Sequence, residues 1–495
     1  MELNLREYQK EIFERGRTDN TLVVIPTGLG KTFIAFALID YFLNKNKGAK
    51  ALFLAPTKPL AHQHMKTSED FLNHKKNLLT GKINPKERTE LWENSEIIFA
   101  TPQTIRNDLK KNRISIKDVS IIIFDEAHRA TGDYAYNYIA REYIRQADGR
   151  IIGMTASPGY SEEDILNVCQ NLYISKIEHR SESDIKEYVK EKDIEKVSVD
   201  FPEQFREILD LLVKCEENKR DELISKGYQK YKLYRKSELL KMQGVLMEQI
   251  RKKKFFFLKP LYLCTQIIKI RHAQELIQTQ GLTSLKNYFE KLKSQKNRSA
   301  SQLLQDDLFV KAMYLTDRFA SEGLVHPKYK ELTRIVRDEI NKGASKIILF
   351  TNFRETSKLV EEFLSSIENV KPVRFFGQKE GMSQKKQIET LEKFKKGDYN
   401  VLISTSIGEE GIHIDEADLG VFFEPVPSVL RMIQRKGRIG RTNIGRIYVL
   451  LTNGCIDERY YHISRAKEKK MNKVLKDVKL DSQTRLEIFN KKDKA

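Results

Sequence analysis

Cysteine is scarce in this chain, which has only four among 495 residues, at positions 169, 215, 264 and 455. The four are far apart and form no C-x-x-C pair, the spacing that structural zinc sites use. A disulfide framework is equally disfavoured, because such frameworks belong to small, cysteine-dense domains. The sequence therefore predicts no structural zinc, and cysteines that act as small hydrophobic core residues.

Long apolar runs are missing as well. No run approaches the roughly 18 residues that a membrane-spanning helix requires, and Met1–Arg6 lacks the apolar core of a signal peptide. The sequence shows no transit peptide, internal repeat or long low-complexity linker. These features predict a globular protein of the reducing cytoplasm, without a membrane partner.

Acidic residues are too few to balance the basic ones. The chain has 69 Asp and Glu against 88 Lys and Arg, which gives a formal charge of +19 and a pI near 9.4. This excess favours an anionic partner, above all nucleic acid, although a basic surface that serves only solubility is the alternative. A chain of this length exceeds what one core supports, so roughly two to four domains are expected.

A candidate phosphate-binding loop follows the first apolar run. Leu22–Ile25 has the length and composition of a buried strand, and it leads directly into the segment PTGLGKT at residues 26–32. In such loops glycines let backbone N–H groups turn toward phosphate oxygens, the lysine reaches the β and γ phosphates, and the threonine hydroxyl binds Mg²⁺. The pattern departs from G-x-x-x-x-G-K-[ST] only at its first position, Ile25, and an ordinary loop is the alternative for this segment alone. We assign ATP contacts to Thr27, Gly28, Gly30, Lys31 and Thr32.

Two adjacent carboxylates, Asp125 and Glu126, end the apolar run Ile121–Phe124 and begin the tetrapeptide that closes with His128. Carboxylates at the mouth of a buried strand are costly unless a cation and hydrogen-bond donors compensate them. In P-loop NTPases an aspartate in this position holds Mg²⁺, a role we assign to Asp125 together with Thr32. Glu126 is then placed to orient and deprotonate the attacking water. ATP and Mg²⁺ are the expected cofactors.

Apolar runs and amphipathic segments alternate in two separate parts of the chain. This alternation is typical of a parallel sheet with helices on both faces. The sequence predicts one α/β domain at 1–200, a second at 326–495, and a block of different character, 201–325, between them. The expected strands are Leu22–Ile25, Ala51–Leu54, Ile97–Ala100, Ile121–Phe124 and Ile151–Met154 in the first domain, and Ile347–Phe350, Val373–Phe376, Val401–Ser404, Leu419–Phe423 and Ile447–Leu451 in the second.

The block at 201–325 has no clear strand and is predicted to be all helical. Between Lys214 and Arg298 it holds 21 Lys or Arg and 8 Asp or Glu, a net +13 of the chain's +19. A basic helical insert with aromatic residues suits binding to a nucleic-acid backbone and wedging at a strand junction. For Phe255–Leu258 the favoured interpretation is the insert's own core, with a wedge as the alternative. The lysines assigned to the backbone are Lys252, Lys253 and Lys254.

Further short motifs occur in the order typical of superfamily-2 helicases, each beside an expected strand. None is specific alone, but the ordered set is. The chain resembles that family over nearly its whole length, which implies two RecA-like motor domains and a DEAH-type tetrapeptide. The motifs are Arg6-Glu7-Tyr8-Gln9, Pro56-Thr57-Lys58-Pro59-Leu60, Thr80-Gly81, Thr101-Pro102-Gln103-Thr104, Thr155-Ala156-Ser157, Phe350-Thr351-Asn352, Ser404-Thr405-Ser406 through Glu410-Gly411, and Gln434-Arg435-Lys436-Gly437-Arg438-Ile439-Gly440-Arg441.

Several matching residues are expected at the nucleotide. Arg438 and Arg441 are three apart and could reach across an interdomain cleft to the γ phosphate as arginine fingers. A basic helix end that binds its own carbonyls is the alternative for this pair. Gln434 is placed to touch the water or the γ phosphate. Gln9, with Arg6 nearby, resembles the adenine-reading element that precedes the phosphate loop.

Other matching residues are expected to couple the domains or to bind nucleic acid. Thr155 and Ser157 are short hydroxyl residues after a strand and could relay between His128 and the second domain. Neutral donors at strand ends suit the phosphate oxygens of a single nucleic-acid strand, with helix capping as the alternative. This set comprises Thr57, Thr80, Thr101, Gln103, Thr351, Asn352 and Thr405.

Within the superfamily, the chain most resembles the archaeal Hef helicases and their eukaryotic relatives, the Fanconi anaemia group M helicases. The resemblance rests on Leu5–Gln9, Phe124–Ala130, Phe423–Ser428 and the helical insert. It implies an ATP-dependent enzyme of replication-fork repair that tracks along one strand of forked or branched DNA. A sliding clamp or a nuclease would be a compatible partner, although no residue indicates either.

Two features depart from that family's pattern. The family commonly has an aspartate two residues after the glycine that matches Gly411, where this chain has His413, so the coupling of ATP to DNA is expected to differ there. Many archaeal Hef proteins also carry a nuclease domain after the helicase. This chain stops at Ala495 without a Glu-Arg-Lys nuclease signature, as a fragment or a helicase-only version would.

Two other functions stay open at this point. Dicer and RIG-I-like RNA helicases are similar and also carry helical inserts, so a motor on double-stranded RNA is the first. The second is a non-catalytic clamp that binds branched nucleic acid and uses ATP only to close. Glu126 and the arginine pair argue against the clamp, because a binding protein needs neither a base nor arginine fingers.

Overall fold

The apolar runs of the first domain form a parallel sheet of seven strands in the order β3-β4-β2-β5-β6-β1-β7. The structure, a computed structural model, describes residues 4–188, 192–228, 236–377, 381–405, 417–425 and 445–478. The five inner strands are buried on both faces, which is why they are apolar runs without alternation, whereas the edge strands β3 and β7 are partly exposed. The strands are β1 (Thr21–Val24), β2 (Lys50–Leu54), β3 (Lys76–Leu79), β4 (Ile97–Ala100), β5 (Val119–Asp125), β6 (Arg150–Thr155) and β7 (Lys176–His179).

Helices cover the two faces of this sheet and divide its core in two. Ile121 and Ile123 pack with one set of helices, and Ile122 and Phe124 pack with the other, because successive side chains of a strand point to opposite faces. The first face is covered by α1 (Glu7–Thr18), α2 (Lys31–Lys45) and α3 (Lys58–Glu69), and the second by α4 (Pro85–Glu93), α5 (Pro102–Lys110), α6 (Ala135–Gln146) and α7 (Glu162–Asn171).

The second sheet has six described strands in the order β10-β11-β9-β12-β13-β8, all parallel. β8 (Lys192–Val199) lies within the range expected for the first domain, yet it pairs along its whole length with β13 (Gly445–Thr452). The chain therefore enters the second sheet before it forms the insert. The other elements are β9 (Ile347–Phe350), β10 (Pro372–Phe375), β11 (Val401–Ser404), β12 (Leu419–Phe422), α14 (Pro327–Asn341), α15 (Arg354–Ser365), α16 (Gln384–Lys396) and α18 (Ile456–Asp477).

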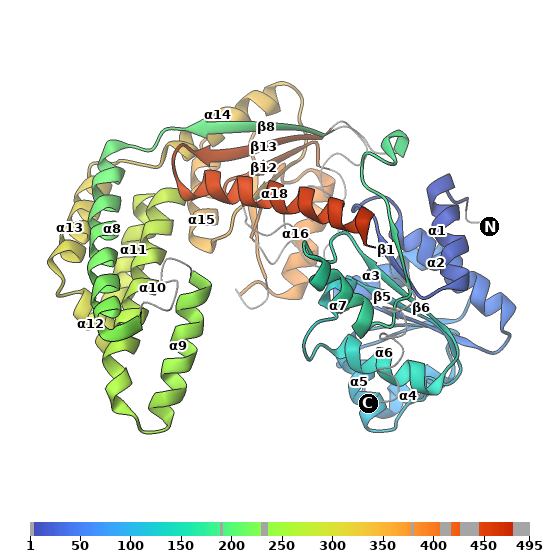
Figure 1. Ribbon diagram of the computed structural model, residues 1–495. Helices are drawn as coiled ribbons and strands as arrows, with labels where there is room; N and C mark the ends of the chain where they lie inside the picture. The colour runs from blue at the N-terminus through green and yellow to red at the C-terminus, as the bar shows by residue number, and fades with distance from the viewer. Residues whose placement is uncertain are drawn as a thin grey trace.

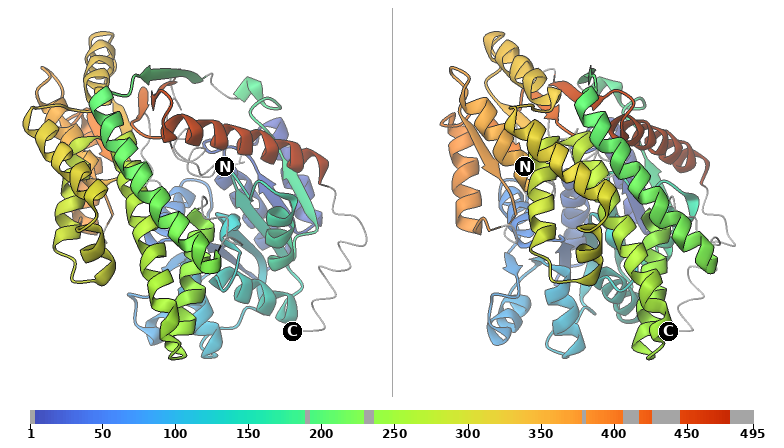
Figure 2. Two further views of the ribbon diagram at one scale, coloured as in Figure 1. Left: turned by 60° about the vertical axis from the view of Figure 1, so that its left-hand side comes forward. Right: turned by 90° about the vertical axis from the view of Figure 1, so that its left-hand side faces the viewer.

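The described residues of the insert form helices joined by short turns, with no strand among them, as predicted. Figure 1 shows it at one end of the molecule, with the first domain at the other end and the second sheet between them. Its helices run alongside one another in both turned views of Figure 2. They are α8 (Glu203–Leu223), α9 (Lys236–Arg251), α10 (Leu258–Thr279), α11 (Leu282–Lys293), α12 (Arg298–Leu303) and α13 (Asp307–Ser321).

The favoured interpretation of the insert's aromatic run is wrong for two of its residues. Phe255 and Phe256 are 64% and 84% exposed, and only Phe257 packs against the apolar cluster of α8, α9 and α10.

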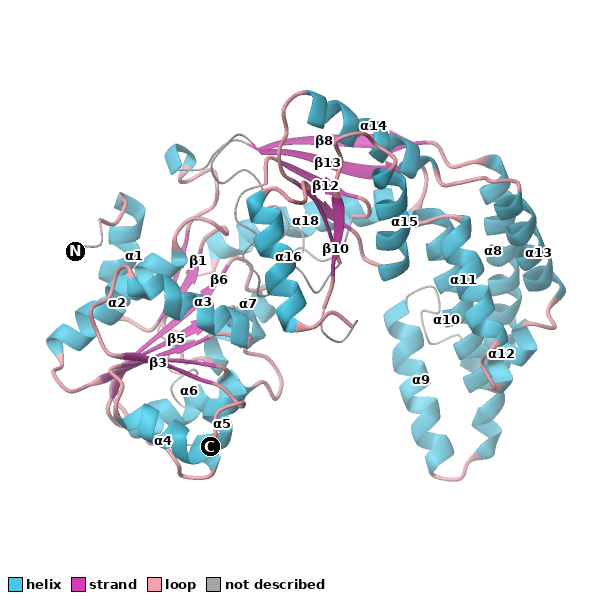
Figure 3. Cartoon of the chain, turned by 180° about the vertical axis from the view of Figure 1, so that it is seen from behind, coloured by secondary structure: helices cyan, strands magenta, loops and turns pink. Residues whose placement is uncertain are grey.

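Ten expected strands are confirmed within a few residues, whereas β3, β7 and β8 were not expected. Figure 3 shows both sheets from behind. The four cysteines are buried free thiols, and no described helix is both long and apolar enough to cross a membrane.

Candidate active site and nucleic-acid interface

The segment at 26–32 forms a tight loop between β1 and α2. Gly28 and Gly30 have φ angles of 83° and 76°, in the left-handed region that favours glycine. Gly30 is also the N-cap of α2, and a Cβ there would lie 2.4 Å from Nε2 of Gln9. Lys31 begins the helix, and its Nζ donates to the carbonyls of Ile25 at 2.9 Å and Pro26 at 3.2 Å. The ammonium group therefore lies across the loop, which is where a bound phosphate chain would meet it.

Gln9 and Arg6, the residues predicted to read adenine, lie beside this loop. Gln9 Oε1 accepts from the Arg6 backbone N–H at 2.9 Å, and its Nε2 donates to the Leu29 carbonyl at 3.4 Å. Tyr8 Oη donates to the same carbonyl at 2.7 Å. Arg6, Gln9, Gly28 and Gly30 share a cavity of about 210 Å³. The start of α1 is thus attached directly to the phosphate loop.

Asp125 is the last residue of β5 and is buried. Its Oδ2 lies 3.0 Å from Nε2 of His64, a residue of α3 that the sequence analysis missed. Burial by itself would raise the pKa of Asp125, but the hydrogen bond and charge of His64 and the nearby ammonium of Lys31 outweigh burial and lower it. The carboxylate is therefore ionised at neutral pH. A carboxylate oxygen near the ammonium group of Lys31, which begins the helix that Thr32 continues, is the kind of ligand that Mg²⁺ prefers, so these residues fit the cation.

Glu126 and His128 lie immediately beyond the strand. Glu126 has a φ of 50°, uncommon for a residue other than glycine, and this backbone turn sends the chain into a short helix at Ala127–Arg129. His128 Nδ1 lies 3.3 Å from Glu126 Oε2 and 3.1 Å from Thr155 Oγ1. Burial, with a smaller effect of Arg129, lowers the pKa of His128 to about 4. The imidazole is neutral at pH 7, so its contact with Glu126 is a polar contact between a neutral ring and a carboxylate.

Hydrogen bonds at the end of β6 connect Thr155, the partner of His128, to α18. Thr155 Oγ1 accepts from the Ser157 backbone N–H at 3.1 Å, and Ser157 Oγ donates to Sδ of Met471 at 3.1 Å. Met471 belongs to α18, which follows the second sheet, yet it is buried in the core of the first domain. Contacts therefore run from His128 through Thr155 and Ser157 to a helix that follows the second sheet, and the role of these residues as a relay stays a prediction.

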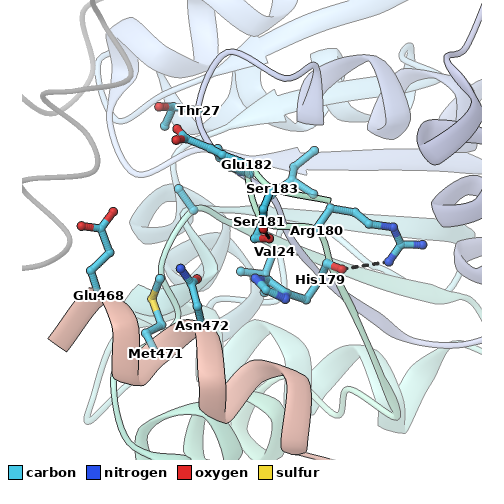
Figure 4. Close-up of a pocket in the computed structure, with 13 residues that line it drawn as sticks. Val24, Thr27, His179, Arg180, Ser181, Glu182, Ser183, Glu468, Met471 and Asn472 are labelled. Carbon is cyan, nitrogen blue, oxygen red and sulfur yellow. Dashed lines mark hydrogen bonds between the residues drawn. The ribbon is translucent and has the colours of Figure 1, made fainter. Parts of the chain in front are cut away.

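A second cavity, of about 160 Å³, opens between the phosphate loop and α18. Figure 4 shows Thr27 on one side of it, the segment after β7 beside it, and Glu468, Met471 and Asn472 on the other. Several predicted nucleotide and coupling residues, namely Gln434, Arg438, Arg441, Gly411 and His413, lie outside the described residues. Their roles remain predictions.

The predicted nucleic-acid contacts of the first domain stand where their strands end. Thr57 is the N-cap of α3 and accepts from the Leu60 N–H at 3.5 Å, so the alternative role of helix capping is present at this residue, and its phosphate contact stays a prediction. Thr101 is the N-cap of α5 without a capping bond from its side chain, and its hydroxyl contacts Thr104 at 2.8 Å. Thr80 is buried after β3, whereas Gln103 is exposed on α5. Because parallel strands end at one edge, all four share the edge that carries the phosphate loop.

The counterparts in the second domain are more enclosed. Thr351 and Thr405 are buried at the ends of β9 and β11. Thr351 Oγ1 donates to Glu424 Oε1 at 3.3 Å, and the Asn352 backbone N–H donates to Glu424 Oε2 at 2.9 Å. Glu424 was missed as a partner, because its position after β12 has meaning only once β12 lies beside β9.

The three lysines of the insert that were assigned to the nucleic-acid backbone lie in the turn that follows α9. Lys252, Lys253 and Lys254 are exposed, and Lys253 has a φ of 61°. Lys252 pairs with Glu248 at 2.7 Å. The exposed Phe255 and Phe256 come next and line an open groove with Lys219, Lys259 and Arg298. Positive charge and exposed aromatic rings are therefore combined on one surface, which we call the insert tip.

A phosphate loop and an acidic pair at one sheet edge, opposite a second parallel-sheet domain, define a P-loop ATPase motor. Three family models match the chain: the type III restriction enzyme res subunit at residues 2–159, the helical bundle of a putative ATP-dependent RNA helicase at 204–322, and the helicase conserved C-terminal domain at 327–443.

Individual proteins give closer comparisons. The crystal structure of the Pyrococcus furiosus Hef helicase domain is 41% identical, with a TM-score of 0.72, and the match covers 94% of this chain and 98% of that one. A putative ATP-dependent RNA helicase of Methanocaldococcus jannaschii is 36% identical over 96% of this chain, and the ATP-dependent DNA helicase mph1 of Neurospora crassa is 34% identical over 92%. The chain spans 61% and 42% of the lengths of these two relatives. It belongs to the ATP-hydrolysing superfamily-2 helicases, in the family of the Hef helicase domain.

Proposed function

We propose that this chain is an ATP-dependent DNA helicase or translocase that acts on forked or branched DNA. The observation that carries the proposal is the combination of a P-loop ATP site with a basic, aromatic insert tip away from it. The match to the Hef helicase domain supports a helicase, and the name of the mph1 relative, an ATP-dependent DNA helicase, supports DNA as the substrate. A motor on double-stranded RNA is the second candidate, because the Methanocaldococcus relative is named an RNA helicase.

At the ATP site, Lys31 would bind the phosphates, Thr32 and Asp125 would hold Mg²⁺, and Glu126 would orient and deprotonate the water. The bound cation would supply charge neutralisation at the β and γ phosphates. Arg438 and Arg441 would complete the site when the second domain closes on the first. Closure and opening with each ATP cycle would then step the strand-contacting residues along DNA.

Two substitutions test the ATP site. Glu126→Gln removes the base while keeping its shape, and we expect hydrolysis to fall by about 10²–10⁴-fold with nucleotide binding retained. Lys31→Ala should weaken nucleotide binding as well as hydrolysis. Lys45→Ala is the matched control, because Lys45 is an exposed lysine at the far end of the same helix. Unchanged DNA-stimulated hydrolysis in both site variants would contradict the proposal.

The substrate is tested by stimulation of hydrolysis with forked DNA, duplex DNA and duplex RNA at one fixed salt concentration. Replacing Lys252, Lys253 and Lys254 by glutamine should lower the preference for forks more than basal hydrolysis, since these lysines lie far along the insert. In a separate salt titration, the slope of log K against log salt should become shallower by about 0.9 for each phosphate that these lysines no longer neutralise. The control removes the same charge at Lys393, Lys395 and Lys396 of α16. Stronger stimulation by duplex RNA than by any DNA would favour the RNA motor.

A further inference from the structure

His64 is a buried polar side chain for which the proposed mechanism has no role so far. It lies on α3, is 7% exposed, and stacks at a tilt against Phe53 with 4.6 Å between ring centroids. Its Nε2 is 3.0 Å from Oδ2 of Asp125. In this bond the imidazole N–H donates and the carboxylate oxygen accepts. One carboxylate oxygen is thus held by a group from a different element.

The helix that carries His64 also carries a predicted nucleic-acid contact. Thr57 caps the first turn of α3, and His64 follows seven residues later. At 1.5 Å per residue the two positions are separated by about 10 Å along one rigid helix. A displacement of the N-terminus of α3 along its axis therefore moves the imidazole against Asp125. Ordinary core packing would require no hydrogen bond to the carboxylate.

We propose that His64 is a positioning residue that fixes the orientation of the Asp125 carboxylate and links it, through α3, to DNA bound at Thr57. The inference rests on the proposed function, because it assumes that Asp125 holds the cation and that α3 meets a DNA strand. Hydrogen-bonded partners of ligating groups fix ligand orientation, and their loss typically costs about 10–100-fold in metal affinity or activity. The link is reciprocal, because the factor by which DNA changes the affinity for the Mg²⁺-nucleotide must equal the factor by which the nucleotide changes the affinity for DNA.

The test compares His64→Leu, which removes the donor, with His64→Gln, whose amide N–H can still donate. His62→Leu is the matched control, because His62 is exposed on the same helix two residues away. Binding of a labelled non-hydrolysable ATP analogue is measured across a Mg²⁺ titration, with and without single-stranded DNA. The thermal midpoint of the protein without nucleotide is recorded for each variant.

We expect His64→Leu to raise the half-saturating Mg²⁺ concentration by about 10–100-fold and to abolish the effect of DNA on analogue affinity. His64→Gln should restore a large part of both effects, and His62→Leu should behave as the natural protein. Equal defects in the Leu and Gln variants, together with a lowered thermal midpoint, would show that His64 serves packing only. Natural Mg²⁺ and DNA responses in His64→Leu would likewise overturn the inference. Lys31→Ala is measured in the same series to separate the two proposals. If Lys31→Ala abolishes hydrolysis while His64→Leu behaves as the natural protein, only the role of His64 is refuted. If Lys31→Ala also leaves hydrolysis unchanged, the proposed function itself is refuted.

Discussion

Truncating Met471 to alanine should release α18 from the first domain. Met471 is 3% exposed and lies with Leu475 in the apolar core of the first domain. In the sequence, the strands of the second sheet lie between that domain and α18. Its Sδ accepts from Ser157, and Lys476 pairs with Asp184 at 3.7 Å in the same interface. The side chain of Met471 is therefore a large part of what attaches α18 to the first domain.

The magnitude follows from burial. Replacing a buried methionine by alanine costs about 2–5 kcal/mol. Here that energy stabilises docking of a helix, and each 1.4 kcal/mol is tenfold, so even the lower value shifts docking by about 30-fold. Lys476 contributes less, because an exposed ion pair is worth about 0–1 kcal/mol.

Hydrogen exchange at residues 467–477 measures the docking directly, because undocked α18 exposes its amides. We expect exchange in this segment to be at least about 30-fold faster in Met471→Ala. Met382→Ala is the control, since Met382 is equally buried but lies in the core of the second domain. Natural exchange rates at 467–477 in Met471→Ala would refute the reasoning that Met471 attaches α18 to the first domain.

Three further predictions concern buried polar groups. Lys328 and Asp457 form a fully buried ion pair, so Lys328→Met alone should lower the free energy of unfolding, measured by chemical denaturation, by about 3–5 kcal/mol. Adding Asp457→Leu should recover most of that loss. A double variant as unstable as Lys328→Met would contradict this prediction. Burial, and then the charge of Lys328, lowers the pKa of His326 to about 3, so the unfolded chain takes up this proton first and stability falls as pH drops from about 6.5 toward 3. His326→Asn keeps an acceptor at the N-cap of α14 and should flatten that acid limb in a series of thermal melts; an unchanged slope would argue against the low pKa. Tyr136 Oη donates to the carbonyls of Asp125 at 2.6 Å and Leu54 at 3.2 Å, so Tyr136→Phe should cost about 1–3 kcal/mol, and a neutral effect in thermal denaturation would contradict that value.

Local chemistry explains why the ATP site could be predicted. Glycines 28 and 30 need left-handed backbone angles, Lys31 must follow them directly, and Asp125 must end a buried strand. Each requirement involves neighbours in the chain, so the residue order shows it. The parallel α/β pattern could also be predicted from the sequence, because strands buried on both faces are continuous apolar runs.

Contacts between distant segments could not be predicted in this way. The composition of β8 does not say that it pairs with β13, and the amphipathic pattern of α18 does not say that Met471 enters the first domain's core. The exposure of Phe255 and Phe256 was misjudged because an apolar run is compatible with either core or surface. Helical periodicity places His64 on an apolar face of α3, but it does not identify Asp125 as the partner.

The sequence by itself thus determined the motor class, the phosphate loop, the acidic pair and the basic insert, because each depends on residue type and short-range spacing. Only the tertiary structure decided which groups complete these motifs: His64 on Asp125, Glu424 on Thr351, and α18 on Ser157. The physical reason is that a hydrogen bond or an apolar contact depends on distance in space, and the packing of two sheets and a helical insert sets those distances.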